Sequence, residues 1–389
     1  MVGGPARTLL PVYLEHDLAW APPAIAVLAA ARLLTAALSA PLGGALADTA
    51  GPRRTLRLGL LGLPLAALLF LTPIAPALAL LVLTIGITDG LQATGGQAYL
   101  VARASRATIG WATGVFFLGS TLGGALGNLA AGPILDRWGF AGLGRVGLVA
   151  GVLVLVGATA LPAGAARPAS HRQSLASVLA GYRPLLGAAN VPELALLRFL
   201  STCYWGAATF LWPLLIARLS GDPATAALFG TVSLALAATA QLAAGRLIDA
   251  IGPTAPTVVL AGLVPVLATL AALALAAGSV TALFVIGVIG TAAAWSLSGT
   301  IPPLIHATAP EGQTGHLVGL LHLLWALAMF TGTLLGGWLV ALNPALPFAA
   351  VAVLNLPTVI AAIRLRRALR PADHRRLRLA EEDPEDALA

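Results

Sequence analysis

Charge is scarce in this chain of 389 residues: only 10% are Asp, Glu, Lys or Arg, whereas soluble domains carry about 25%. Lysine is absent, so every basic side chain except histidine is an arginine. Cys203 is the only cysteine, which excludes a disulfide framework and a thiolate metal site. The chain has no Walker loop and no His-Glu-x-x-His or Gly-x-Ser-x-Gly pattern. We therefore expect no catalytic residues, no cofactor, no metal and no use of ATP.

Apolar residues dominate instead: 58% belong to the hydrophobic set, and the mean hydropathy is +0.91. The long continuous runs approach the ~20 residues that a helix needs to cross a bilayer, and they lack the alternation of membrane β-strands. We predict an all-α membrane protein of two six-helix bundles, nominally with twelve spans of which the first is incomplete. The complete spans are expected at 22–47, 57–75, 77–101, 108–135, 143–164, 191–218, 224–248, 256–277, 279–304, 315–341 and 345–364.

The arginines set the expected orientation. With a cytoplasmic C-terminus, sixteen of them lie on the cytoplasmic side, while Arg137, Arg145 and Arg218 lie outside. This bias predicts a multi-pass protein of the inner (plasma) membrane with its C-terminus in the cytoplasm. Because the arginines lie in short loops beside the spans, the net charge of +7 predicts contact with membrane lipids and not with nucleic acid.

An internal repeat divides the chain. Gly44, Asp48, Gly51 and Pro52 recur 201 residues later, and Gly110, Gly114, Gly127 and Gly132 recur 205 residues later. Duplicated six-span halves are a known plan of transporters. We expect an N-terminal bundle at 1–164, a cytoplasmic connector with an amphipathic helix at 165–190, a C-terminal bundle at 191–365 and a cytoplasmic tail at 366–389. A plain linker is the alternative for the connector.

The repeat also indicates that the first span is short. Pro11 corresponds to Pro213, so the first dozen or so residues of the span that begins at Val191 have no counterpart. Residues 1–20 are therefore expected to be too few to cross the bilayer alone. A misassigned start codon is the favoured explanation, and a genuinely short first span is the alternative.

The segment between spans 2 and 3 carries a motif, which reads Gly44-Ala45-Leu46-Ala47-Asp48-Thr49-Ala50-Gly51-Pro52-Arg53-Arg54. It resembles the cytoplasmic loop signature of the major facilitator superfamily, G-x-x-x-D-x-x-G-x-R-R. Gly44 permits close helix approach, Gly51 permits a tight turn, and Asp48 is an anion that a helix N-terminus can receive. The resemblance implies a gating loop, with Arg103 or Arg106 close to Asp48.

The second copy of this motif is degenerate. It contains Gly245, Asp249 and Gly252, but Pro253 and Thr254 stand where the first copy has its basic pair. A latch that depends on arginines is therefore expected only on the first side. When the cytoplasmic side is closed, we expect Asp48 to face the N-terminal end of span 11, near residues 314–316.

Span 5 is rich in glycine. It contains Gly119, Gly123, Gly127 and the pair Gly132-Pro133, and it resembles the family's fifth-span signature, whose Gly-Pro is associated with exchangers. Glycines at this spacing make a smooth face for close helix packing. Generic packing of small residues is the alternative.

Ionisable residues at membrane depth are costly and usually functional. Arg32, Asp89, Gln92 and Arg198 are the predicted substrate or proton pathway; Asp89 and Gln92 share a helix face, and Arg32 is expected near enough to Asp89 to influence its charge. A structural pair is the alternative for Arg32 and Asp89, and snorkelling to the membrane surface is the alternative for Arg198. Many drug exchangers of the family carry Arg-x-x-Gln here, where this chain has Asp89 in place of the arginine.

The resemblance implies a monomeric secondary transporter that moves a small organic solute by alternating access, coupled to protons. We predict efflux of an amphipathic compound, neutral or weakly cationic, because Asp89 can cancel Arg32. Uptake of an organic anion is the alternative, since Arg7, Arg32 and Arg198 outnumber the one carboxylate. A membrane receptor that moves no solute is the alternative from another class. Most tryptophans on the later spans are expected to be packing residues, and some to line a cavity.

Overall fold

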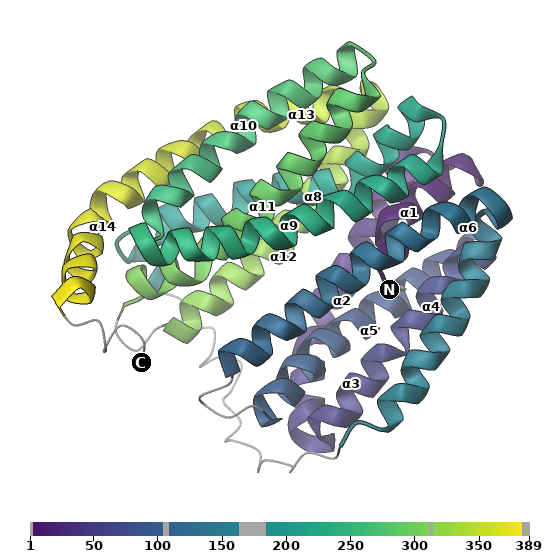
Figure 1. The fold of residues 1–389 in the computed structure, drawn as a ribbon, viewed down its shortest axis with the longest axis horizontal. Coiled ribbons are helices and arrows are strands. Elements are labelled where there is room, and N and C mark those ends of the chain that lie inside the picture. The colour runs from purple at the N-terminus through teal and green to yellow at the C-terminus, as the bar shows by residue number, and fades with distance from the viewer. Residues whose placement is uncertain (1–2, 104–108, 163–183, 311–313, 383–389) are drawn as a thin grey trace. The chain divides into compact units, whose positions relative to one another are not determined.

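The computed structural model describes residues 3–103, 109–162, 184–310 and 314–382, all of them in helices or in the short segments between them (Figure 1). In its first half the helices are α1 (Gly3–His16), α2 (Pro22–Ala50), α3 (Pro52–Leu60), α4 (Gly62–Leu68), η1 (Leu69–Leu71), α5 (Ala75–Arg103) and α6 (Ile109–Thr159). They are followed by η2 (Pro184–Gly187), α8 (Val191–Ser220), α9 (Pro223–Ile251), α10 (Thr254–Ala276), α11 (Val280–Thr308), α12 (Thr314–Leu342), α13 (Leu346–Leu354) and α14 (Leu356–Glu382).

The helices match the predicted spans closely. Within the described residues, ten segments are long and apolar enough to cross a membrane. One of them lies in α6, which breaks at Gly139 (φ 60°, ψ −167°) into two helices; the spans expected at 108–135 and 143–164 lie on either side of this break. The predicted all-helical membrane fold is confirmed.

Two segments differ from simple spans. Helix α1 has 14 residues and is not among the ten. Helix α14 continues without a break from the last span to Glu382, through much of the segment expected as a tail. The amphipathic helix expected in the connector lies almost entirely outside the described residues, which include only η2 of that segment.

The chain forms two compact units. Unit 1 comprises Met1–Arg172, Gly206–Ala235 and Met329–Pro344, and unit 2 comprises Gln173–Trp205, Leu236–Ala328 and Ala345–Ala389. The borders therefore fall inside α8, α9 and α12. As a result, unit 1 contains α1 to α6 together with parts of three helices from the second half of the chain.

Each unit has its own apolar core. In unit 1, the rings of Tyr13, Phe70 and Phe140 are all buried and lie 5.1–5.8 Å apart, between centroids. In unit 2, a buried cluster includes Leu194, Leu304 and residues of α12 and α14. Many other leucines and valines are exposed, such as Leu38 at 66% and Leu80 at 67%. An apolar surface of this extent suits contact with lipid.

Candidate functional site

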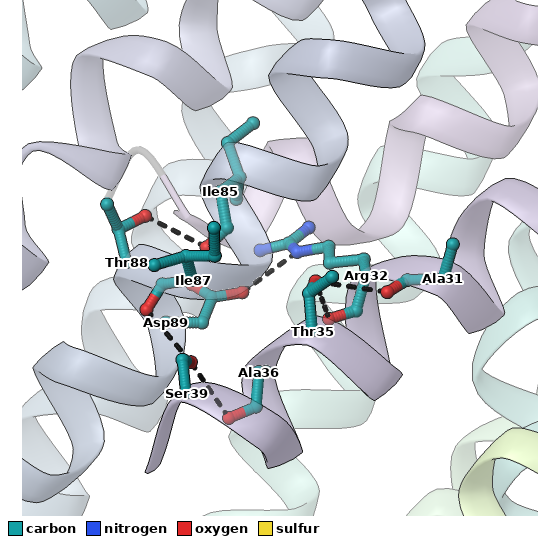
Figure 2. Close-up of polar contacts among 9 residues, drawn as sticks. All are labelled: Ala31, Arg32, Thr35, Ala36, Ser39, Ile85, Ile87, Thr88 and Asp89. Carbon is teal, nitrogen blue, oxygen red and sulfur yellow. Dashed lines mark hydrogen bonds and ion pairs between the residues drawn. The ribbon is translucent and has the colours of Figure 1, made fainter. Parts of the chain in front are cut away.

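A charged pair lies within the spans of unit 1. Arg32 of α2 donates from Nε to Oδ2 of Asp89 in α5 at 2.8 Å, and Figure 2 shows the two side chains pointing at one another. The pair is partly enclosed, since 15% of the Arg32 side chain and 34% of the Asp89 side chain are exposed. The expected proximity is confirmed, whereas the role of these residues in transport stays a prediction.

Small residues bring α2 and α5 close enough for this pair to form. A Cβ at Gly86 of α5 would overlap the hydroxyl of Thr35 in α2, and a Cβ at Gly90 would overlap that of Ser39, one turn further on. The Ser39 hydroxyl also donates to a backbone carbonyl of α5 at 3.1 Å (Figure 2). This is the small-residue packing common between membrane helices. It places Asp89, the residue before Gly90, at the interface of α5 with α2.

Arg7 brings a second positive charge near the pair. It lies in α1, and its side chain is exposed although those of Ala6 and Leu9 are buried. The charge of Arg7 is repelled by Arg32 and attracted by Asp89. Among the side chains that the structure describes, Arg7 forms no ion pair of its own. The site therefore holds two guanidinium groups and one carboxylate.

Gln92 lies one turn after Asp89 and is half-buried. Its backbone packs against Gly59 of α3, where a Cβ would lie 2.5 Å from the Cα of Gln92. Gln92 thus lies at the interface of α5 with α3, whereas Asp89 points to Arg32 of α2.

The predicted gating loop turns at a glycine in both copies of the repeat. Gly51, between α2 and α3, has φ 93°, and Gly252, between α9 and α10, has φ 79°. Side chains with a Cβ rarely adopt this region, whereas glycine does so freely. The sequence repeat therefore coincides with a repeat of backbone geometry.

The arginines after Gly51 have a structural task that the motif did not predict. Arg53 donates from Nη2 to the carbonyl oxygen of Thr159 at 2.8 Å, and Arg57 donates from Nε to that of Ala158 at 2.8 Å. Both carbonyls belong to the last turn of α6, whose unpaired oxygens and dipole favour cations. Arg54 is exposed. This turn of α3 therefore caps α6 within unit 1.

Most side chains of the other gating-loop residues lie outside the described part of the chain. Gly44 and Asp48 lie in α2, Arg103 lies in α5 and Asp249 lies in α9, but their side chains are outside the described part, and Arg106 lies in the undescribed segment 104–108. Gly245 is half-buried, and a Cβ there would meet open space. The latch between Asp48 and residues 314–316 stays a prediction.

The glycines of the first part of α6 differ in their surroundings. A Cβ at Gly119 would meet open space, and one at Gly132 would lie 4.0 Å from the Cβ of Ala224. The close approach occurs instead at Gly124, where a Cβ on Gly4 of α1 would overlap the backbone. Close packing stays a prediction for Gly123, Gly127 and Pro133.

A polar cluster within unit 1 joins the two halves of the sequence. Arg218 of α8 donates from Nε to both carboxylate oxygens of Glu15 in α1, at 2.7 and 2.8 Å, and its Nη2 also contacts Oε1. Asn128 of α6 donates to Thr8 at 3.1 Å, and a Cβ at Gly230 of α9 would overlap the Asn128 amide. We name these five residues the outer cluster, because the arginine bias assigns Arg218 to the outside. No motif predicted it, since Glu15 and Arg218 are 203 residues apart.

Unit 2 contains a pocket between α8, α10 and α11. Arg198 lines it and donates from Nη1 to the hydroxyl of Ser298 at 3.3 Å. Trp205 also lines it, and its ring lies 6.2 Å from that of Trp295, between centroids, at 76°. Arg198 is thus held to α11 by a neutral group, and no carboxylate among the described side chains pairs with it.

A family model identifies the fold from the sequence as well. The model, described as Major Facilitator Superfamily, matches residues 5–192 and 194–387, one half of the chain after the other. The chain belongs to the major facilitator superfamily. As a member of this superfamily it is a multi-pass membrane transporter of small molecules and not an enzyme, which confirms the predicted resemblance.

Solved superfamily transporters share the whole architecture. A POT family transporter in complex with 5-aminolevulinic acid gives a TM-score of 0.73 at 14% identity, over 96% of this chain and 93% of that one. The nucleoside transporter NupG gives 0.73 at 12%, over 94% and 95%. The human organic anion transporter MFSD10 gives 0.61 at 20%, over 87% and 83%. These identities establish the fold alone. No curated protein matches the sequence.

Proposed function

We propose that this transporter is a proton-coupled exporter of a small amphipathic organic compound, which works by alternating access. The observation that carries the proposal is the Arg32–Asp89 pair, a carboxylate in the middle of a membrane span, one third exposed and 2.8 Å from a guanidinium. Ionisable groups at this depth commonly serve as proton relays.

The coupling step follows from the charges of the pair. A proton taken up by Asp89 removes the anion that holds Arg32, so α2 and α5 lose one of their cross-links. Arg7 is within electrostatic range of both residues, and it competes for the carboxylate once Arg32 moves. Protonation of Asp89 therefore leaves both arginines without this counter-ion, whereas release of the proton lets the carboxylate pair with either of them, and the exchange biases the packing of three helices.

Alternating access is supported by the outer cluster. Its contacts join α1 and α6 to α8 and α9, so they close one end of the bundle and must separate when that end opens. The bundles at 1–164 and 191–365 are then the moving bodies, as expected for parallel repeats. The gating loop at Asp48 serves the opposite, cytoplasmic end.

Efflux is supported by Gly132-Pro133, which in the family is associated with exchangers. We place the protein in the inner (plasma) membrane with its C-terminus in the cytoplasm, on the arginine bias. The working unit is a monomer in contact with lipids, since each six-helix repeat supplies one half of the pathway.

The proposal is tested by proton movement in proteoliposomes. Purified protein is reconstituted with a pH-sensitive dye inside, and amphipathic compounds of positive, zero and negative charge are added one at a time. Substrate-dependent proton flux is expected for at least one compound, and Asp89→Asn should abolish it. Asp136→Asn, at an exposed position, is the matched control and should keep the flux. Transport by Asp89→Asn with unchanged pH dependence would remove Asp89 from the mechanism.

Uptake of an organic anion is the second candidate. It is favoured by Arg7 and Arg198, which form no ion pair among the described side chains. The two candidates differ in direction: an exporter fills inside-out vesicles when their lumen is acidic, whereas an uptake system of this kind fills right-side-out vesicles when the outside is acidic. Filling of only the second preparation would replace efflux by uptake.

A further inference from the structure

We infer that the pocket in unit 2 binds an anionic group, with Arg198 as its anion-binding residue, and that the transported compound is a small aromatic carboxylate or a similar organic anion. The inference rests on the proposed transport function, and it replaces the neutral or weakly cationic substrate expected from the sequence by an anionic one. Its basis is an incompletely paired guanidinium, a hydroxyl and an aromatic wall, which meet in one place.

The described residues satisfy the guanidinium of Arg198 only in part. Its Nε is buried and has no hydrogen-bond partner among the described residues, and its Nη1 has only the long bond of 3.3 Å to Ser298. Arg198 is half-buried, and a partly desolvated charge is costly unless an anion or a polar group compensates for it. A carboxylate can accept two parallel bonds from an arginine, so a bound anion would supply what the site lacks.

The position of Arg198 argues against snorkelling. Ser298 lies ten residues before the end of α11, which is about 15 Å along the helix, and it holds Nη1 at that depth. A snorkelling arginine extends its head group toward the membrane surface. Arg198 instead reaches a neighbouring helix inside the span, and Ser298, which also lines the pocket, is itself exposed.

An aromatic wall stands beside the charge. Trp205 lines the pocket with Arg198, and it packs edge-on against Trp295. The indole Nε1 of Trp295 is buried and has no hydrogen-bond partner in the described part of the chain, so the ring packed against Trp205 carries an unpaired donor of its own. Flat rings bind well against such surfaces, which favours an aromatic acid over an inorganic anion.

The charge that lines the pocket is positive. Of the residues that line it, Arg198 alone is charged. His322 of α12 lies within electrostatic range of Arg198, and it would add positive charge when protonated. A cation would be repelled here, and a neutral amphiphile would leave the charge of Arg198 uncompensated.

The first experiment compares three ligands of nearly one shape on the unmodified protein. Binding of 2-naphthoate, 2-naphthamide and 2-naphthylmethylammonium to the purified full chain is measured by calorimetry in detergent. The carboxylate should bind at least about tenfold more tightly than the amide, the loss expected for one charge-assisted hydrogen bond, and the ammonium should bind most weakly. Equal affinities, or preference for the ammonium, would overturn the inference without any variant.

The second experiment assigns the binding to Arg198. Arg198→Gln should weaken 2-naphthoate binding by about tenfold or more, and Ser298→Ala should weaken it less. Arg145→Gln, which removes an exposed charge outside this pocket, is the matched control and should have no effect. If Arg198→Gln does not fold, the comparison of carboxylate with amide and the Ser298→Ala result still decide.

Transport assays distinguish a failure of the anion site from a failure of the proposed transport function. Binding of 2-naphthoate without proton-coupled movement in proteoliposomes would keep the anion site and reject the proposed function. Proton-coupled movement of a neutral or cationic compound that is unchanged in Arg198→Gln would keep the proposed function and reject the anion site.

Discussion

Arg32 and Arg198 are both arginines within membrane spans, but their side chains have different partners. Arg32 meets the carboxylate of Asp89 at 2.8 Å, and glycines of the neighbouring helix hold it there. Arg198 meets only the hydroxyl of Ser298, and its Nε is left without a partner among the described residues. One charge is neutralised inside its own unit, whereas the other remains available to a ligand.

In the mechanism that we propose, these two similar residues have different tasks. A paired charge responds to protons, because protonation of its partner breaks the pair. An unpaired charge responds to anions, because it has no internal counter-ion. This contrast is tested first by measuring how much each arginine contributes to the stability of the folded protein.

Arg32→Gln should destabilise the protein, and Arg198→Gln should not. Removal of Arg32 leaves a partly buried carboxylate unpaired, at a cost of about 1–3 kcal/mol, less than for a fully buried pair because Asp89 is 34% exposed. Removal of Arg198 takes away a charge that is already unpaired, so stability should stay equal or rise. The measurement is thermal unfolding in detergent, followed by tryptophan fluorescence.

A double variant provides the control for this prediction. Arg32→Gln/Asp89→Asn should recover most of the stability lost by either single change, since a neutral pair can share a hydrogen bond. Independent, additive losses would mean that the two charges do not stabilise one another, and the contrast with Arg198 would disappear.

Hydropathy and spacing predicted the spans and the two-fold repeat, because the bilayer imposes their length. They also predicted that Arg32 and Asp89 would be close. They did not identify Gly86 and Gly90 as the residues that make this possible. The chain has 43 glycines, and a glycine at helical spacing indicates a smooth face without naming the helix that covers it.

Gly86→Ala tests whether that packing sets the pair. The added Cβ would overlap Thr35 and lie 2.5 Å from the carbonyl oxygen of Arg32, so α2 must shift, at a cost of about 1–3 kcal/mol. Proton-coupled transport should fall with it. Gly119→Ala is the matched control, because its Cβ would meet open space. Equal behaviour of the two variants would show that close approach of α2 and α5 is not needed.

A third arginine, Arg218, extends the comparison to a pair at a helix end. Glu15→Gln should weaken the outer cluster and raise the population open to the outside, by about tenfold or less for a single exposed ion pair. In a Cys203→Ser background with Thr8→Cys, a membrane-impermeant maleimide should then label the protein faster from outside. Asp17→Asn is the control, and no change in labelling rate would exclude a sealing role for Glu15.

The outer cluster could not be predicted from the sequence. Glu15 and Arg218 lie on helices that come together only through the packing of unit 1, and neither stands in a recognisable motif. The same holds for Arg53, whose motif suggested a gate but whose side chain caps α6 together with that of Arg57. The motif predicts that charged residues are needed in this loop, but only the folded structure shows which atoms their side chains contact.

Asp222 is a carboxylate outside the spans. It is hydrogen-bonded by neutral groups, whereas Asp89 is paired with a guanidinium. Asp222 caps α9: its Oδ1 accepts from the backbone N–H of Ala224 at 2.9 Å, and its Oδ2 accepts from the N–H of Thr225 at 3.0 Å and from the Thr225 hydroxyl at 2.7 Å. Burial raises the pKa of Asp222, but these hydrogen bonds outweigh it and hold the pKa below its ordinary value of 3.8.

Asp222→Ala should therefore cost about 1 kcal/mol of stability near neutral pH, the usual loss of a helix cap. Because the folded-state pKa is lowered, the charged form contributes its stability at every pH above the ordinary value, and this contribution is lost as the pH falls through the folded value. The gap between wild type and Asp222→Ala should be constant from pH 7 to about pH 5 and should narrow below about pH 4. Melting temperatures across this range measure it, with Asp136→Asn as a control for general acid effects. A gap that already changes between pH 7 and pH 5 would mean that a group other than Asp222 controls the difference.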